Sequence, residues 1–286
     1  MGNKNEQITD YKYLKNIYRE SIKSRSDRIT YSSPWPPDEN KKYANRIKRA
    51  GSCTLKDAVS KSKIAAIHKK SEEYFTTGNM ISAGRDLSAL ATGLVSSDQL
   101  YKDYNDWPRI NNSIISKGVS AFRNSTDNVK ILNPFITIPE TLELALNDKI
   151  IDIAHKYFGA PPSISYVKLV KNFANSLPCF NTQKYHIDLS SIKLLKAIFY
   201  LNDVGSGDGP HCYVLGSHKE KEKIKNWSDS ATLYGGQSEE SLLQNYTPDR
   251  FLKLFGDTGD VILEDTTGLH KGEKPVNKDR DVLIIT

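Results

Sequence analysis

The stretch Gln183-Lys184-Tyr185-His186-Ile187-Asp188-Leu189 is the most informative part of the chain. Residues 185–189 are expected to form a strand, and side chains two apart on a strand project from one face, so His186 and Asp188 can chelate one ion. An H-x-D pair alone is weak support, because chance and structural hydrogen bonds supply many such pairs. The stretch therefore predicts a β domain with two candidate metal ligands, and a third must come from elsewhere.

The third candidate ligand is His270, at the end of the later strand-like stretch 259–270. Two histidines and one carboxylate that leave coordination positions open are the facial triad of non-haem iron(II) oxygenases. His211 is the alternative ligand, but it stands in a turn that enters a strand and has no chelating partner two residues away. The spacing therefore favours His186, Asp188 and His270.

Arg280 follows His270 across a turn around residues 276–278. A strand-turn-strand hairpin would return its guanidinium to the same cavity, where the planar fork suits a carboxylate. The alternative for Arg280 taken alone is a surface ion pair. The sequence thus offers a candidate anion-binding residue beside the candidate metal ligands.

The second half of the chain reads as short strands separated by Gly, Asn, Asp and Pro turns. The expected strands are 163–170, 185–189, 194–201, 212–215, 260–263 and 281–285. Several short strands behind a helical front half predict an α+β protein whose core, about 163–286, is an all-β barrel or jelly roll.

The front half, about 49–160, shows two amphipathic helical patterns, one from Thr54 to Phe75 and one from Pro139 to Gly159. His68 stands among lysines and is expected to be a solvated helix residue. His155 is expected to interact with carbonyls at a helix end. Further helices are expected near 97–104 and 111–119.

Two segments are expected to lie outside the barrel. Residues 1–48 are polar and broken by prolines, which indicates a surface extension. Residues 219–256 form a charged insertion with helical signals at 239–245 and 249–255, and an insertion of this length is typical of a lid. Its Lys219, Lys221, Lys223 and Lys225 could meet an anion, but lysine alternating with glutamate more often marks a solvated face.

Composition narrows the class of protein. The 286 residues carry 40 basic and 34 acidic side chains, and the excess of +6 is spread along the chain, which disfavours nucleic-acid binding. Three cysteines without a C-x-x-C pair suit a reducing compartment. We see neither an apolar leader nor a stretch of about 18 apolar residues, so we expect a cytoplasmic protein without a membrane partner.

Longer motifs carry a resemblance. From about Arg49 onward the chain resembles the phytanoyl-CoA hydroxylase-like family of iron(II)/2-oxoglutarate dioxygenases. The matching text is H-x-D at 186–188, LKAIFYLNDVGSGDGPHCYVLGSHK at 195–219, GDTGDVILEDTTGLHKG at 256–272, LALNDKIIDIAHKYFG at 144–159, and Arg280. Together with their surroundings these motifs extend the resemblance over more than half of the chain.

The resemblance implies a double-stranded β-helix, a cupin-like barrel with flanking helices, in which residues 49–286 form the dioxygenase domain. It implies that His186, Asp188 and His270 bind Fe(II), that Arg280 binds the distal carboxylate of 2-oxoglutarate, and that Tyr200 contacts this cosubstrate. Three protein ligands on an octahedral ion leave two positions for 2-oxoglutarate and one for O2. His218 matches a position that shapes the barrel.

The implied reaction is hydroxylation of a small organic substrate with release of succinate and CO2. Halogenating relatives carry a small residue in place of the carboxylate ligand, whereas this chain has Asp188. The different-class alternative is a non-catalytic jelly roll that binds a small ligand or sugar, for which the four site residues would be dispensable. The identity of the substrate and the oligomeric state are left open.

Overall fold

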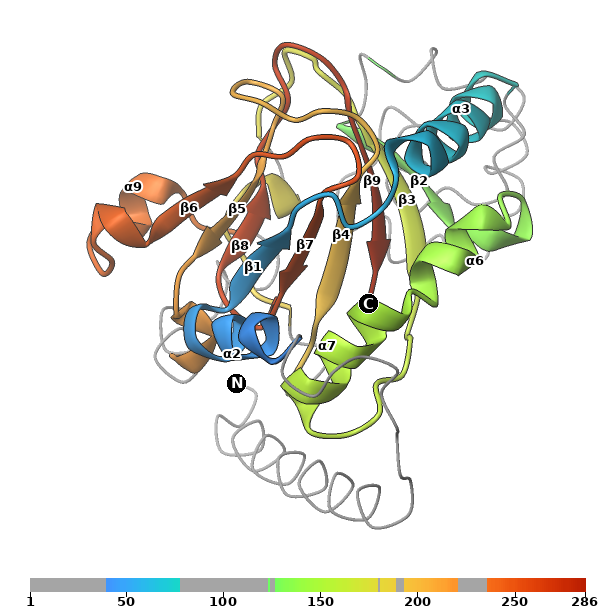
Figure 1. The fold of residues 1–286 in the computed structure, drawn as a ribbon. Helices are drawn as coiled ribbons and strands as arrows, with labels where there is room; N and C mark the ends of the chain where they lie inside the picture. The colour runs from blue at the N-terminus through green and yellow to red at the C-terminus, as the bar shows by residue number, and fades with distance from the viewer. Residues whose placement is uncertain (1–39, 78–122, 124–126, 180, 189–192, 221–235) are drawn as a thin grey trace, which may run out of the picture.

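The computed structural model describes residues 40–77, 123, 127–179, 181–188, 193–220 and 236–286. Its centre is a pair of antiparallel sheets that face each other (Figure 1). The larger sheet has the order β1(Ser52–Leu55), β7(Val261–Glu264), β4(Lys196–Tyr200), β9(Arg280–Ile285), β3(Val167–Asn172), β2(Asn128–Leu132). The smaller sheet has the order β6(Phe251–Leu254), β5(His211–Val214), β8(His270–Gly272).

Alternation along β4 shows how this strand separates two cores. Ala197 and Phe199 belong to the core that the larger sheet shares with the helices. Ile198 and Tyr200 belong to the core between the sheets, together with Tyr213 of β5. Because side chains alternate along a strand, Lys196 lies on the same inner face as Ile198 and Tyr200. A charged residue therefore points into the barrel.

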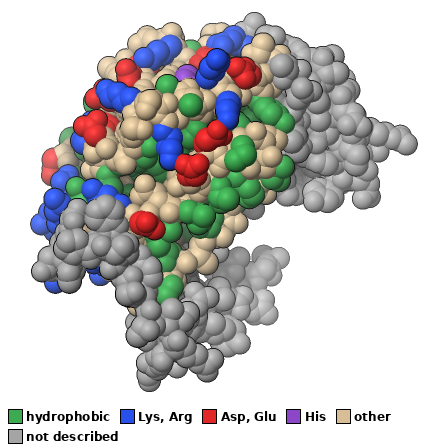
Figure 2. All heavy atoms as spheres, turned by 45° about the vertical axis from the view of Figure 1, so that its right-hand side comes forward, with side chains coloured by type: hydrophobic (Ala, Val, Ile, Leu, Met, Phe, Trp, Pro, Cys, Tyr) green, Lys and Arg blue, Asp and Glu red, His purple; other side chains and the backbone are tan. Residues whose placement is uncertain are grey.

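The helices cover the outer face of the larger sheet (Figure 1). They are α2(Lys41–Ala50), α3(Lys61–Thr77), α6(Glu140–Ala145) and α7(Asp148–Phe158); α9(Glu239–Leu242) lies beside β6. Single 3-10 turns are η3(Pro134–Ile136), η4(Asn181–Gln183), η5(Ser217–Lys219) and η7(Pro248–Arg250). Figure 2 shows Lys, Arg, Asp and Glu side chains intermixed on one described face, so neither sign of charge dominates there.

The expected surface extension at residues 1–48 is wrong for the part that the structure describes. From Lys41 the chain forms α2, which packs against α7 and buries Ala44 and Ile47 in the helical core. Alanine and isoleucine three residues apart lie on one face of a helix, and this short apolar stripe is hard to see among lysines and arginines. Residues 1–39 lie outside the described residues.

The two expected front-half helices begin or break elsewhere. Residues 52–55 form β1, with Cys53 opposite Leu263, and α3 starts only at Lys61. The expected helix at 139–159 is two helices, because the Asn147 side chain accepts a hydrogen bond from the Ile150 N–H (3.2 Å) and caps the start of α7. A capping residue inside a periodic pattern marks a new helix.

The charged insertion is shorter than expected at its C-terminal end. The helical signal at 249–255 is wrong, since Phe251–Leu254 is β6 and pairs with β5. The signal at 239–245 is confirmed as the short α9. Residues 221–235 and the expected helices near 97–104 and 111–119 lie outside the described residues, while β2 was not expected.

No helix in the described part of the chain combines the length and the apolar character that crossing a membrane requires.

Candidate metal centre

His186 and His270 meet at an isolated antiparallel bridge between the two histidine-bearing segments. The His186 N–H donates to the His270 carbonyl (2.9 Å), and the His270 N–H donates to the His186 carbonyl (3.0 Å). Residues opposite each other in such a pair project from one face, and the two ring centroids are 4.2 Å apart. The segment 185–189 was expected to be a strand, and its described part, 185–188, instead makes single bridges at Tyr185 and His186.

Both imidazoles are arranged to offer the same nitrogen. His186 Nδ1 lies 3.0 Å from the Lys184 carbonyl, and His270 Nδ1 lies 2.9 Å from the Gly268 carbonyl. A carbonyl can only accept, so each Nδ1 carries the proton and each Nε2 has a free lone pair. Burial lowers the pKa of His186 to about 4 and that of His270 to about 3. At neutral pH both rings are therefore uncharged and suited to bind a metal.

Asp188 completes the cluster. Its N–H donates to the Thr266 carbonyl (2.8 Å), and its Oδ2 lies 3.7 Å from His270 Nε2. Burial raises the pKa of Asp188, but electrostatic attraction outweighs it, from His270, which is protonated at the low pH where this carboxyl titrates, and from the Lys196 ammonium. The pKa of Asp188 therefore lies well below the usual range. The ligand atoms of His186, Asp188 and His270 all lie within 4.8 Å of one another. Two neutral imidazoles and one ionised carboxylate fit a divalent transition metal.

Arg280 lies inside the barrel near the same strand that carries His270. Its side chain is 5% exposed, its Nη1 donates to the Glu273 carbonyl (3.2 Å), and its Nε has no hydrogen-bond partner. A Cβ on Gly272 would lie 2.7 Å from Arg280 Nη2, so this glycine leaves the space that the guanidinium fills. Among the described residues, Arg280 has no ion-pair partner. A buried cation of this kind calls for an anion.

Tyr200 is fully buried beside Arg280. Its hydroxyl donates to the Leu254 carbonyl of β6 (2.7 Å) and accepts from the His211 N–H of β5 (2.9 Å). These two bonds connect β4 of the larger sheet to two strands of the smaller sheet. A cosubstrate contact by Tyr200 stays a prediction, and the visible role of its hydroxyl is to join the two sheets.

His211 is stacked on His270, with ring centroids 5.7 Å apart, but it is outside the three-residue cluster. Its Nε2 lies 2.6 Å from Glu264 Oε1, and neither atom has a hydrogen-bond partner among the described residues. Burial raises the pKa of Glu264 to about 7 and lowers that of His211 to about 3.

Sequence reasoning missed two charged residues in the barrel, Lys196 and Glu264. Lys196 Nζ donates to Asp188 Oδ2 at 2.5 Å, and Glu264 is completely buried. Lys196 interrupts the apolar stretch LLKAIFY, and this interruption is the signal that could have found it, whereas Glu264 merely ends the apolar stretch of VILE and gives no such signal.

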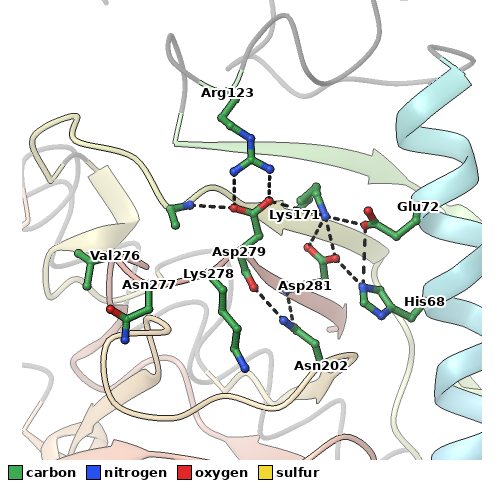
Figure 3. A pocket seen from close by; sticks show the side chains of 11 residues that line it. His68, Glu72, Arg123, Lys171, Asn202, Val276, Asn277, Lys278, Asp279 and Asp281 are labelled. Atoms are coloured by element: carbon green, nitrogen blue, oxygen red, sulfur yellow. Dashed lines mark hydrogen bonds and ion pairs between the residues drawn. The ribbon is translucent and has the colours of Figure 1, made fainter.

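Another cluster with metal-binding residue types lies on the outer side of the larger sheet, where His68, Glu72 and Asp281 approach within 4.8 Å (Figure 3). It borders a pocket of about 510 Å³. Lys171 Nζ already pairs with both of its carboxylates, 2.6 Å from Glu72 Oε1 and 3.0 Å from Asp281 Oδ2. His68 is thus not the solvated residue that we expected, because its Nε2 lies 2.8 Å from Asp281 Oδ2. An internal ammonium ion takes the place of a metal here.

One divalent metal per chain is therefore expected when metal-free protein is titrated with Mn(II). His270→Ala should remove this site, because it deletes a ligand, and His68→Ala should leave the stoichiometry unchanged. Isothermal titration calorimetry checks both. A stoichiometry that falls with His68→Ala and not with His270→Ala would assign the metal to the outer cluster.

The chain was compared with known proteins. No protein-family model matches it, and no curated protein matches it. Solved structures do match in fold. SnoN, an epimerase in complex with Fe3+, alpha ketoglutarate and nogalamycin RO, has a TM-score of 0.57 at 13% identity, over 87% of this chain and 83% of SnoN. EctD from S. alaskensis with bound Fe has a TM-score of 0.55 at 18% identity, over 88% and 78%.

HygX from Streptomyces hygroscopicus, with nickel, 2-oxoglutarate and hygromycin B bound, has a TM-score of 0.52 at 15% identity, over 85% of each chain. At these identities the likeness concerns the fold. The expected fold class is confirmed: the two antiparallel sheets and flanking helices are the cupin-like double-stranded β-helix of these proteins.

Proposed function

We propose that this chain is an Fe(II)- and 2-oxoglutarate-dependent dioxygenase that hydroxylates a small organic substrate. The observation that carries the proposal is the buried guanidinium of Arg280, which lacks an anionic partner among the described residues. This guanidinium lies against Gly272, on the strand that begins at His270. A metal cluster alone suits many reactions. A metal cluster beside a buried, unpaired cation suits an anionic chelating cosubstrate.

The spacing along β8 fits such a cosubstrate. Gly272, whose missing Cβ makes room for Arg280, stands two residues beyond His270, and residues so spaced are about 7 Å apart on one face of a strand. A five-carbon dicarboxylate can chelate the ion with its oxoacid end and reach the guanidinium with its distal carboxylate. His186 and His270 would each offer Nε2 to the ion, Asp188 would offer a carboxylate oxygen, and Arg280 would hold the other end of the cosubstrate.

Bound iron would supply the activation of O2. One oxygen atom enters the succinate that remains after 2-oxoglutarate loses CO2, and the other enters the substrate, so the reaction balances without another reductant. The protein contributes neutral imidazoles, an orienting cation and a buried interior, which together fix the reactants and restrict water. We also infer membership of the phytanoyl-CoA hydroxylase-like family, on the motifs that include His186, Asp188 and His270.

Small molecules are the proposed substrates. SnoN and HygX, which share the fold, were crystallised with nogalamycin RO and hygromycin B, and this supports a small metabolite as the substrate of the present chain. We further propose that the enzyme is cytoplasmic and binds neither nucleic acid nor membranes. The rival binding module would need a ligand for Arg280 but neither iron nor O2.

Anaerobic addition of Fe(II) and 2-oxoglutarate to the metal-free chain tests the proposal. We expect a weak visible charge-transfer band that requires both components, and formation of succinate once O2 is admitted. A folded protein that gives neither the band nor succinate would contradict the proposed function and favour the binding module. Substrate screening would follow a positive result, with succinate formation above the uncoupled rate as its measure.

A further inference from the structure

Lys196 occupies the metal side of the barrel in the described structure. It stands on the inner face of β4, its side chain is 9% exposed, and its Nζ lies 2.5 Å from Asp188 Oδ2. The same oxygen lies 3.7 Å from His270 Nε2, so it is the carboxylate oxygen that faces His270. An ammonium ion on this oxygen and a divalent metal bound by the same cluster would repel each other at short range.

Glu264 offers Lys196 another partner. The two residues are directly opposite each other in the antiparallel pair of β4 and β7, which places their side chains on one face with Cβ atoms about 5 Å apart. Glu264 is completely buried, and neither of its carboxylate oxygens has a hydrogen-bond partner among the described residues. Its one charged-type neighbour at short range there is the His211 ring, with Nε2 2.6 Å from Oε1, and burial lowers the pKa of that ring to about 3, so it brings no positive charge at neutral pH. Buried carboxylates without donors are rare, and a functional role or a bound ion is among their explanations.

We propose that Lys196 is an internal counter-ion with two positions, Asp188 in the metal-free protein and Glu264 when a divalent metal is bound. The metal would take over the Asp188 oxygen, and the ammonium would move to the Glu264 carboxylate across the strand pair. Lys196 is thus a positioning residue that neutralises Asp188 and then leaves this carboxylate to the metal. This inference rests on the metal centre proposed above.

Opposite changes in metal affinity follow from the two positions. Lys196→Met removes the cation that competes for Asp188, so the metal should bind about tenfold more tightly, within the range that residues hydrogen-bonded to metal ligands commonly exert. Glu264→Gln keeps the size of the side chain but removes the charge that receives the ammonium. The displaced Lys196 then lacks an ionic partner, and the metal should bind about tenfold more weakly.

Calorimetric titration of the metal-free full chain with Mn(II) alone measures these affinities without 2-oxoglutarate or turnover. The variants are Lys196→Met, Glu264→Gln and the double variant, which should resemble Lys196→Met because Glu264 then has no ammonium to receive. Lys253→Met is the matched control, since Lys253 also pairs with a glutamate, Glu273, but lies on β6 with a 46% exposed side chain. It should bind Mn(II) as the wild type does.

The outcomes separate this inference from the proposed function. If the wild-type chain binds Mn(II) but folded Lys196→Met binds it no more tightly, the two-position role is overturned and the metal centre stands. If Lys196→Met does not fold, Glu264→Gln decides, and an affinity equal to that of the wild type overturns the inference. If the wild-type chain binds no Mn(II), both the metal centre and the counter-ion role fall.

Discussion

Asp188→Ala is expected to lower succinate-forming turnover by about a thousandfold or more, equivalent to about 4 kcal/mol of lost transition-state stabilisation. The change removes the only carboxylate of the His186, Asp188 and His270 cluster and with it the negative charge that balances a divalent ion. It also removes the carboxylate that accepts the Lys196 hydrogen bond, which adds a loss of stability. Turnover is measured as succinate formed at saturating Fe(II) and 2-oxoglutarate.

Asp203→Ala is the matched control for this change. Asp203 is an exposed carboxylate that accepts hydrogen bonds from Thr258 outside the barrel, so its removal should leave turnover near the wild-type value. Circular dichroism establishes that Asp188→Ala is folded. A folded Asp188→Ala variant that retains a tenth or more of wild-type turnover would remove Asp188 from the metal centre.

Arg280→Ala is expected to raise the KM for 2-oxoglutarate about a hundredfold, because loss of one partner of a buried, hydrogen-bonded charge pair costs about 2–5 kcal/mol. Turnover at saturating 2-oxoglutarate should fall much less than in Asp188→Ala. Gly272→Ala should change the KM in the same direction by a smaller factor, since its new Cβ would press on Arg280 Nη2. Steady-state kinetics with varied 2-oxoglutarate measure both.

Stability distinguishes a binding role for Arg280 from a structural one. A buried guanidinium without an anion is costly, so thermal unfolding of Arg280→Met without cosubstrate should occur no lower than that of the wild type. The wild type should gain more stability than Arg280→Met on addition of 2-oxoglutarate and Mn(II). A strongly destabilised Arg280→Met with an unchanged KM would make Arg280 a structural residue.

The sequence predicted the strands of the barrel and the three candidate metal ligands because both depend on local patterns. Strand alternation and turn residues predicted β4, β5, β7 and β9 to within a few residues. The i and i+2 spacing placed His186 and Asp188 on one side of the chain, and the structure brings them to His270. Their roles as iron ligands, and that of Arg280, remain proposals that the experiments above test.

What the sequence did not predict depends on contacts between distant segments. β1 and β6 exist because Cys53 pairs opposite Leu263 and Leu254 opposite His211, and neither segment is long enough to show a clear period by itself. Lys196 and Glu264 are similar cases. A single charge in or beside an apolar strand can be interpreted as a buried ion-pair partner only when the strand pairing is known to place the two side chains opposite each other.

The histidine bridge also bears on chain entropy. His186 lies on a segment joined to its surroundings by isolated bridges, whereas His270 begins a strand, and about 80 residues of chain separate them. An ion bound by both imidazoles would act as a crosslink that closes this long loop, as a disulfide does. If the ion stayed bound in unfolded chains, it would lower their conformational entropy. Metal loading would then stabilise the pairing of two distant parts of the barrel besides equipping it for chemistry.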